Sequence, residues 1–219
     1  MRNADGVRNL AHIVEGEDSL FIIVSAMGKT TNALERVFAH MQNGRKEEAN
    51  EEIKQIQAYH AEIIDDLWGE HTDINEVTLL FGQLRNIVND IVYRSTDAEL
   101  WYDTIVAFGE LISTTIISKY LNYIGTRNRW IDMRTTLLTN QRHKDANVDI
   151  KASKHRLRAS IENTGVGVFV GQGFIGGAPD GTTTTLGREG SDYSAAVVAN
   201  ILMAESMSVW KDVEGVLNA

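Results

Sequence analysis

The chain has 219 residues but no cysteine and only one proline. Without cysteine it forms no disulfide and has no thiolate chemistry, which fits a reducing compartment, and we expect a cytoplasmic protein. It has no run of about 18 apolar residues and no signal-peptide core at its start, so no membrane span is expected. Basic residues are also outnumbered, with 21 Lys and Arg against 30 Asp and Glu. The resulting net charge of −9 argues against nucleic acid as a partner.

Hydrophobic residues make up 43% of the chain, enough for a substantial core. Continuous apolar runs at 20–25 and 166–170 predict buried parallel strands, and 129–133 and 207–212 predict two further short strands. Apolar residues at helical spacing predict helices over 53–67, 74–91, 98–122 (with Gly109 as a possible break), 149–163 and 191–204. Alternating strands and helices favour an α/β fold, a three-layer α/β/α sandwich with a mostly parallel central sheet. The helix over 191–204 is nearly all apolar, so we expect it to be buried.

The stretch 182–196 carries the strongest local signal. Four threonines predict a short strand, which the turn at Pro179-Asp180-Gly181 separates from an earlier extended piece. Gly187 and Gly190 allow tight turns, and Ser191 can cap the following helix. Arg188 adds a planar guanidinium beside that helix start. The stretch therefore predicts a site for an anion such as a carboxylate or a phosphate.

Three other patterns have ordinary explanations. Gly28-Lys29-Thr30 follows a strand, but Ile23 stands where a P-loop requires glycine. The segment 171–176 has the spacing of a dinucleotide fingerprint, but the helix that must follow directly is missing. The basic run 151–158 reads as a solvated helix face. No histidine pair has metal-ligand spacing, so no protein-held metal is expected.

Five segments in order form a recognisable set: 25–32, Phe108-Gly109-Glu110, 172–176, the stretch 182–196 and the closing 210–216. This set resembles the catalytic domain of the aspartokinases in the amino-acid kinase family, over nearly the whole chain. The stretch from Leu186 to Tyr193 is the most specific part of the likeness. The resemblance implies the amino-acid kinase fold.

The resemblance also implies an enzyme that transfers the γ-phosphate of MgATP to the side-chain carboxylate of L-aspartate, giving 4-phospho-L-aspartate. That reaction opens the biosynthesis of lysine, threonine and methionine. Because the nucleophile is the substrate's own carboxylate, already ionised at neutral pH, no general base is needed. The protein must align two anions and offset charge on the moving phosphoryl group. The expected ligands are L-aspartate and ATP, with Mg²⁺ held through the nucleotide phosphates.

By the same resemblance, Arg188 grips an aspartate carboxylate and Glu110 holds the substrate ammonium. Asp192 orients groups in the site and, with Arg188, is a candidate catalytic residue. The remaining implied contacts with the substrate are Ser25, Thr31, Phe174 and Ser191. The implied contacts with the nucleotide are Lys211, Asp212 and Gly215.

The chain also departs from the family pattern. We interpret residues 1–219 as a catalytic-domain fragment. The first strand with its Lys-Phe-Gly-Gly motif is absent, as are the C-terminal part of the domain and the regulatory ACT domains. That motif meets the ATP phosphates, so the fragment is expected to fold at least partly but to be a poor catalyst. The full-length protein is expected to form a homo-oligomer.

Three alternatives remain open at this point. The chain could belong to another member of the same family that acts like glutamate 5-kinase. It could be a non-catalytic, aspartate-binding regulatory module. The weakest alternative is a dinucleotide-binding oxidoreductase.

Overall fold

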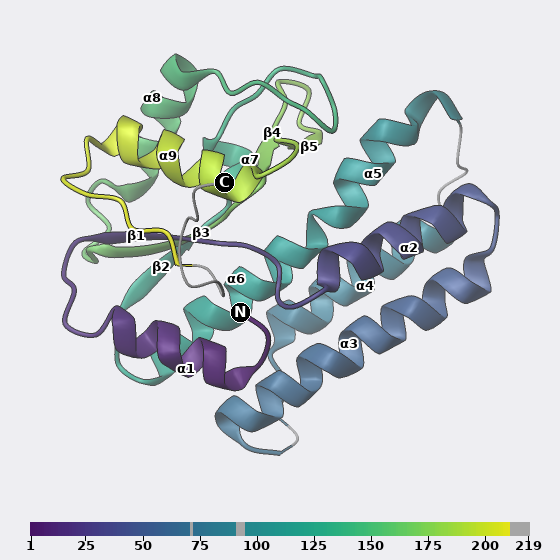
Figure 1. Cartoon of the computed structure of the whole chain (residues 1–219), viewed down its shortest axis with the longest axis horizontal. Helices are drawn as coiled ribbons and strands as arrows, with labels where there is room; N and C mark the ends of the chain where they lie inside the picture. The colour runs from purple at the N-terminus through teal and green to yellow at the C-terminus, as the bar shows by residue number, and fades with distance from the viewer. Residues whose placement is uncertain (71, 91–94, 211–219) are drawn as a thin grey trace, which may run out of the picture.

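The computed structural model describes residues 1–70, 72–90 and 95–210. It is an α/β protein, which confirms the predicted fold class (Figure 1). The strands are β1 (Leu20–Val24), β2 (Asn128–Ile131), β3 (Val168–Gln172), β4 (Ile175–Gly177) and β5 (Thr183–Thr185). The helices are α1 (Ala4–Ile13), α2 (Thr30–Gln42), α3 (Lys46–Trp68), α4 (Asn75–Asp90), η1 (Ser95–Asp97), α5 (Ala98–Val106), α6 (Phe108–Tyr123), α7 (Met133–Thr136), α8 (Ile150–Ile161) and α9 (Gly190–Leu202).

The central sheet is parallel, with the strand order β1-β3-β2. Leu20 and Asn128 both align with Val168, so the three strands begin together and end at one edge. Side chains alternate between the two faces, as the strand period of two requires. Val168 and Val170 belong to one apolar cluster and Phe169 to another. The sheet thus separates two hydrophobic cores.

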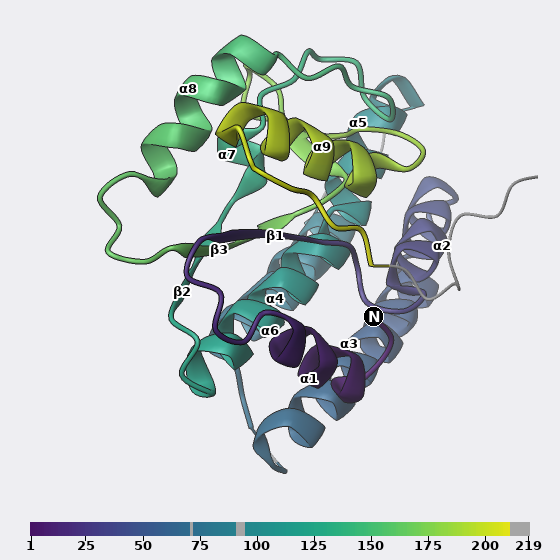
Figure 2. The ribbon, with the colours of Figure 1, turned by 60° about the vertical axis from the view of Figure 1, so that its left-hand side comes forward.

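Helices cover both faces of this sheet. The helix α6 contacts all three strands on one face, and α9 contacts β1 on the other. Figure 2 shows α1 and α6 on one side of the sheet and α8 and α9 on the opposite side. The helices α2 to α5 extend the first layer beyond the sheet (Figure 1). The three-layer arrangement follows from two apolar faces that both need cover.

The stretch Ala98–Tyr123 is long and apolar enough to cross a membrane by length and composition, but 78% of its most apolar window is buried inside the molecule. It therefore packs as core helices of the fold. The predicted break at Gly109 is wrong by two residues, because the helix divides at Ala107. Gly109 lies inside α6, where a Cβ would come within 2.8 Å of the Ala26 side chain. Its role is close packing of α6 against the loop after β1.

The predicted turn at 179–181 is confirmed, since it joins β4 and β5 in an antiparallel hairpin. The strand predicted for 207–212 is wrong in its described part, because 207–210 form no strand. A strand needs a hydrogen-bonded neighbour, and none of the described strands pairs with this segment. Residues 211 and 212 lie outside the described part of the chain.

The helix α9 differs from the prediction at its start and in its burial. Ser191 is not the cap: the N-cap is Glu189, with φ 59°, and Ser191 lies in the first turn. The helix is buried along one face only, and Tyr193 is 43% exposed on the other. Small residues such as Ala195 and Ala196 have low polarity without requiring burial, so composition overstated how much of α9 lies inside.

Candidate active site

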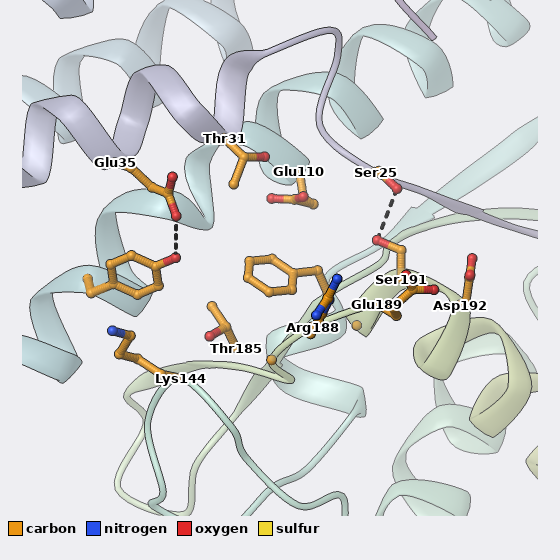
Figure 3. A pocket seen from close by; sticks show the side chains of 14 residues that line it. Ser25, Thr31, Glu35, Glu110, Lys144, Thr185, Arg188, Glu189, Ser191 and Asp192 are labelled. Carbon is orange, nitrogen blue, oxygen red and sulfur yellow. Dashed lines mark hydrogen bonds between the residues drawn. The ribbon is translucent and has the colours of Figure 1, made fainter. Parts of the chain in front are cut away.

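All seven predicted site residues in the described part of the chain line one open cavity of about 550 Å³ (Figure 3). They are Ser25, Thr31, Glu110, Phe174, Arg188, Ser191 and Asp192. The cavity lies just beyond the carboxyl ends of β1 and β3, where α2, α6 and α9 begin. Ligands of parallel α/β folds bind at this edge of the sheet. The structure thus brings together residues that stand up to 167 positions apart, from Ser25 to Asp192.

Glu110 is the most unusual group in the cavity. It stands in the first turn of α6 and is only 3% exposed. The Ala26 N–H donates to its Oε1 at 3.1 Å, whereas Oε2 has no hydrogen-bond partner among the described residues. Burial raises the pKa of Glu110 to about 8, and hydrogen bonds from the backbone of Ala26 and of Glu110 itself only partly oppose this. A buried carboxylate oxygen without a partner is costly, and a cationic ligand in the cavity would satisfy it.

Arg188 supplies a cation to the same cavity. It lies in the short loop between β5 and α9, after Gly187, whose φ of 74° turns the chain. Within the described part of the chain, Arg188 forms no ion pair with a carboxylate, although acidic groups line the same cavity. An unpaired guanidinium that lines a cavity is suited to grip a carboxylate or phosphate with two parallel hydrogen bonds.

The hydroxyl groups of Ser25 and Ser191 meet across the cavity edge. The Ser25 Oγ donates to the Ser191 Oγ at 3.0 Å and joins the end of β1 to the first turn of α9. Gly173 packs beneath this pair, since a Cβ there would lie 2.9 Å from the Ser191 Cα. Asp192 follows on the same turn, and Thr31 lies in the first turn of α2. These four residues thus contribute three hydroxyls and one carboxylate to the lining of the cavity.

Phe174 occupies a strained backbone conformation, with φ 67°. Its N–H donates to the Ser194 Oγ at 3.0 Å, and its carbonyl accepts from the Leu186 N–H at 2.8 Å. Five described non-glycine residues have positive φ, and three of them line the cavity: Lys144, Phe174 and Glu189. Such a conformation costs about 1–2 kcal/mol for an L-residue. Strain concentrated in this way is typical of functional sites.

Glu35, Tyr102, Lys144 and Thr185 are among the cavity residues that the sequence did not predict as site residues. The Tyr102 hydroxyl donates to the Glu35 carboxylate at 2.7 Å, and the Lys144 Nζ lies 4.6 Å from the centre of the Tyr102 ring. Burial, followed by the hydrogen bond to Glu35, raises the pKa of Tyr102, so the phenol stays neutral. These residues come from α2, α5, the loop before α8 and β5, and no local motif links them.

Asp103 links two of these cavity residues, Lys144 and Thr185, through hydrogen bonds. It is fully buried and accepts hydrogen bonds from the Thr185 hydroxyl at 2.6 Å and the Thr185 N–H at 3.0 Å. It also accepts from the Lys144 N–H at 2.9 Å and the His143 Nδ1 at 3.0 Å. Burial raises the pKa of Asp103, and these hydrogen bonds oppose that rise. One carboxylate thereby fixes α5, the loop 143–144 and β5 together.

The predicted nucleotide contacts Lys211, Asp212 and Gly215 lie outside the described residues. Within the described ranges, no group of three or more His, Asp or Glu side chains is placed to hold a metal ion.

The fold and the cavity agree with the comparisons to known proteins. Residues 1–219 match the family model described as the amino acid kinase family. The chain therefore belongs to the amino acid kinase family.

Within that family the chain is similar to aspartokinases. It is 30% identical over 214 residues to the lysine-sensitive aspartokinase 3 of Escherichia coli K12, covering 97% of this chain and 46% of that protein. It is 32% identical over 213 residues to the chloroplastic aspartokinase 1 of Arabidopsis thaliana, covering 92% and 36%. The structure of E. coli aspartokinase III with aspartate and ADP superposes with a TM-score of 0.85 at 28% identity, covering 97% of this chain and 47% of that one. The chain thus spans about half the length, or less, of these relatives.

Proposed function

We propose that this chain is the catalytic domain of an aspartate kinase, which transfers the γ-phosphoryl group of MgATP to the side-chain carboxylate of L-aspartate. The observation that carries the proposal is that one cavity is lined by both Glu110 and Arg188. Among the described residues, the buried Glu110 Oε2 has no hydrogen-bond partner and the Arg188 guanidinium has no ion-pair partner. An α-amino acid presents the complementary groups, an ammonium and a carboxylate. The similar E. coli enzyme was solved with aspartate and ADP, which supports the same ligand pair here.

Recognition of the amino acid rests on charge. The substrate ammonium binds the Glu110 Oε2, which has no hydrogen-bond partner among the described residues. Because burial raises the pKa of Glu110, this carboxyl group must also release its proton to solvent when the ammonium binds. Arg188 grips a substrate carboxylate through its planar fork. Two fixed, opposite charges orient a small zwitterion better than either one alone.

The chemical step needs alignment more than proton transfer. The attacking carboxylate is ionised at neutral pH, so no side chain has to remove a proton from it. The hydroxyls of Ser25, Thr31 and Ser191 can donate hydrogen bonds to oxygens that gain charge in the transition state. Asp192 stands beside Ser191 at the start of α9 and orients groups in the site. Mg²⁺, when bound with the nucleotide, offsets phosphate charge and is held mainly by phosphate oxygens.

Hydroxylamine trapping tests the proposal, because it converts the acyl phosphate to a coloured hydroxamate. We expect aspartyl hydroxamate to accumulate with MgATP and L-aspartate, slowly and at high protein concentration. The variant Glu110→Gln should lower the rate at least tenfold, since it removes the charge that holds the ammonium. The matched control is Glu47→Gln, on an exposed position of α3, which should leave the rate unchanged. Equal rates for the parent and Glu110→Gln would contradict the proposal.

The hydroxamate assay, together with a thermal stability measurement, distinguishes two alternative functions from this proposal. Faster product formation from L-glutamate would favour a glutamate 5-kinase-like enzyme. Thermal stabilisation by L-aspartate with no hydroxamate at any protein concentration would favour a regulatory module. We propose further that the enzyme acts in the cytoplasm as a homo-oligomer, at the start of lysine, threonine and methionine synthesis.

A further inference from the structure

Lys144 is a second cation in the cavity, at a distance from the Ser25–Ser191 pair. Figure 3 places Lys144 and Glu35 toward one end, Ser25, Ser191 and Asp192 toward the other, and Arg188 between them. We propose that Lys144 is a substrate-binding residue whose ammonium holds one carboxylate of the dicarboxylic amino acid, while Arg188 holds the other. This inference rests on the proposed function and adds a residue to its binding site.

The backbone of Lys144 is held in an unfavourable conformation. Its φ is 65°, in the left-handed region that glycine and asparagine adopt far more readily than lysine. The Lys144 N–H donates to both carboxylate oxygens of Asp103, at 2.9 and 3.2 Å. The buried Asp103 also holds Thr185, another cavity residue, so the loop cannot relax without breaking this cluster. The fold therefore maintains a strained lysine at the cavity wall.

The positive charge of Lys144 remains available. Its Nζ lies 4.6 Å from the centre of the Tyr102 ring, and over the described ranges it forms no ion pair with a carboxylate. A cation–π contact orients an ammonium group without neutralising its charge. Glu35, at the same end of the cavity, accepts a hydrogen bond from the Tyr102 hydroxyl at 2.7 Å (Figure 3). Glu189 and Asp192 lie at the opposite side of the cavity, beside Ser191 (Figure 3).

Three charged groups of the cavity, Arg188, Glu110 and Lys144, then complement the three charged groups of the substrate. Aspartate carries two carboxylates and one ammonium group at neutral pH. Arg188 and Glu110 account for one carboxylate and the ammonium, which leaves one carboxylate without a cation. Among the described residues that line the cavity, Lys144 is the cation besides Arg188. Its ammonium binds the ground state and the transition state alike, so its loss should raise KM for aspartate and leave kcat nearly unchanged.

Calorimetric titration of L-aspartate into the parent protein and three variants tests this role. Lys144→Asn removes the charge and tolerates the left-handed backbone, so it should fold as stably as the parent and raise the Kd about tenfold. Lys144→Arg restores the charge and should stay within about threefold of the parent. The matched control is Lys151→Asn, an equal charge change on the exposed face of α8, which should leave the Kd unchanged.

Each outcome decides one question. Parent-like aspartate binding by Lys144→Asn overturns the role of Lys144 and leaves the proposed function standing. A loss of ADP affinity in Lys144→Asn, with aspartate binding intact, also overturns it by assigning the ammonium to a phosphate. Failure of the parent protein itself to bind aspartate counts against the proposed function, and the role of Lys144 falls with it.

Discussion

The hydroxyl groups of Ser25 and Ser191 lie 3.0 Å apart, although 166 positions separate them in the sequence. One residue follows the edge strand β1, and the other stands in the first turn of α9. Their hydrogen bond ties the end of the sheet to the helix layer that contains α9, at the edge of the cavity. The geometry of the proposed substrate site therefore depends on how closely α9 approaches the sheet.

Gly173 controls that approach, so Gly173→Ala should damage the site. A Cβ at this position would lie 2.5 Å from the Ser191 Oγ and 2.9 Å from its Cα, so the backbone of α9 must shift. We expect aspartate affinity to fall at least tenfold, and stability to fall by about 1–3 kcal/mol. Calorimetry and urea denaturation measure the two effects.

Gly82→Ala is the matched control for that substitution. Gly82 lies in α4, and nothing approaches within 4 Å of a Cβ built there. Alanine should stabilise this helix by up to about 1 kcal/mol and leave aspartate binding unchanged. Equal aspartate affinity in Gly173→Ala and Gly82→Ala would refute the role assigned to the Ser25–Ser191 contact.

Burial of Glu110 should make stability depend on pH. The pKa is about 8 in the folded protein, against 4.5 for an unperturbed side chain. Between these values the folded state keeps a proton that the unfolded chain has released, so the free energy of unfolding falls as pH rises from about 4.5 to 8. Glu110→Gln has no such group, so relative to the parent it should gain on the order of 3 kcal/mol between pH 5 and pH 8. Urea denaturation at several pH values measures this difference.

Glu62→Gln, on an exposed position of α3, provides the comparison for Glu110→Gln and should parallel the parent at every pH. A constant stability difference between the parent and Glu110→Gln across this pH range would show that Glu110 is ionised in the folded protein.

The same carboxyl group should couple aspartate binding to proton release. If the substrate ammonium binds ionised Glu110, the proton held below pH 8 must leave as the ligand arrives. Aspartate affinity should then rise with pH by up to about tenfold per unit and level off above pH 8. Titrations in buffers of different ionisation enthalpy should report close to one proton released at pH 7. No proton release would place the ammonium elsewhere.

Asp103 should be a large contributor to stability. Asp103→Ala leaves the Lys144 N–H, the Thr185 N–H and the Thr185 hydroxyl without their acceptor. Loss of a buried, multiply hydrogen-bonded carboxylate should cost about 3 kcal/mol or more. It should also weaken aspartate binding, because Lys144 and Thr185 line the cavity. The exposed Asp18→Ala serves as control, and a cost under about 0.5 kcal/mol for Asp103→Ala would contradict this assignment.

Much of the fold could be predicted from local sequence. The apolar runs at 20–25 and 166–170 became β1 and β3, because a strand buried on both faces needs such runs. The turn at Pro179 was recoverable because proline, aspartate and glycine restrict the chain locally. The division at Ala107 was not, since nothing in that residue opposes a helix, and the break depends on how α5 and α6 pack.

The residues of the candidate site also fall into those that the sequence could predict and those that it could not. Arg188, Ser191 and Asp192 lie within one short stretch, and a family pattern could locate them along with Glu110. Lys144, Tyr102 and Glu35 come from three separate segments and meet only in the folded chain. Their convergence depends on Asp103, whose burial and hydrogen bonds are properties of the tertiary structure. No periodicity or spacing in the sequence carries that information.

A crystal structure of this protein with L-aspartate tests the central claim most directly. The account predicts the ligand in the cavity between α6 and α9, with its ammonium within hydrogen-bond distance of the Glu110 Oε2 and a carboxylate on Arg188. Aspartate bound elsewhere, or bound in the cavity with the Glu110 Oε2 still without a partner, would contradict it.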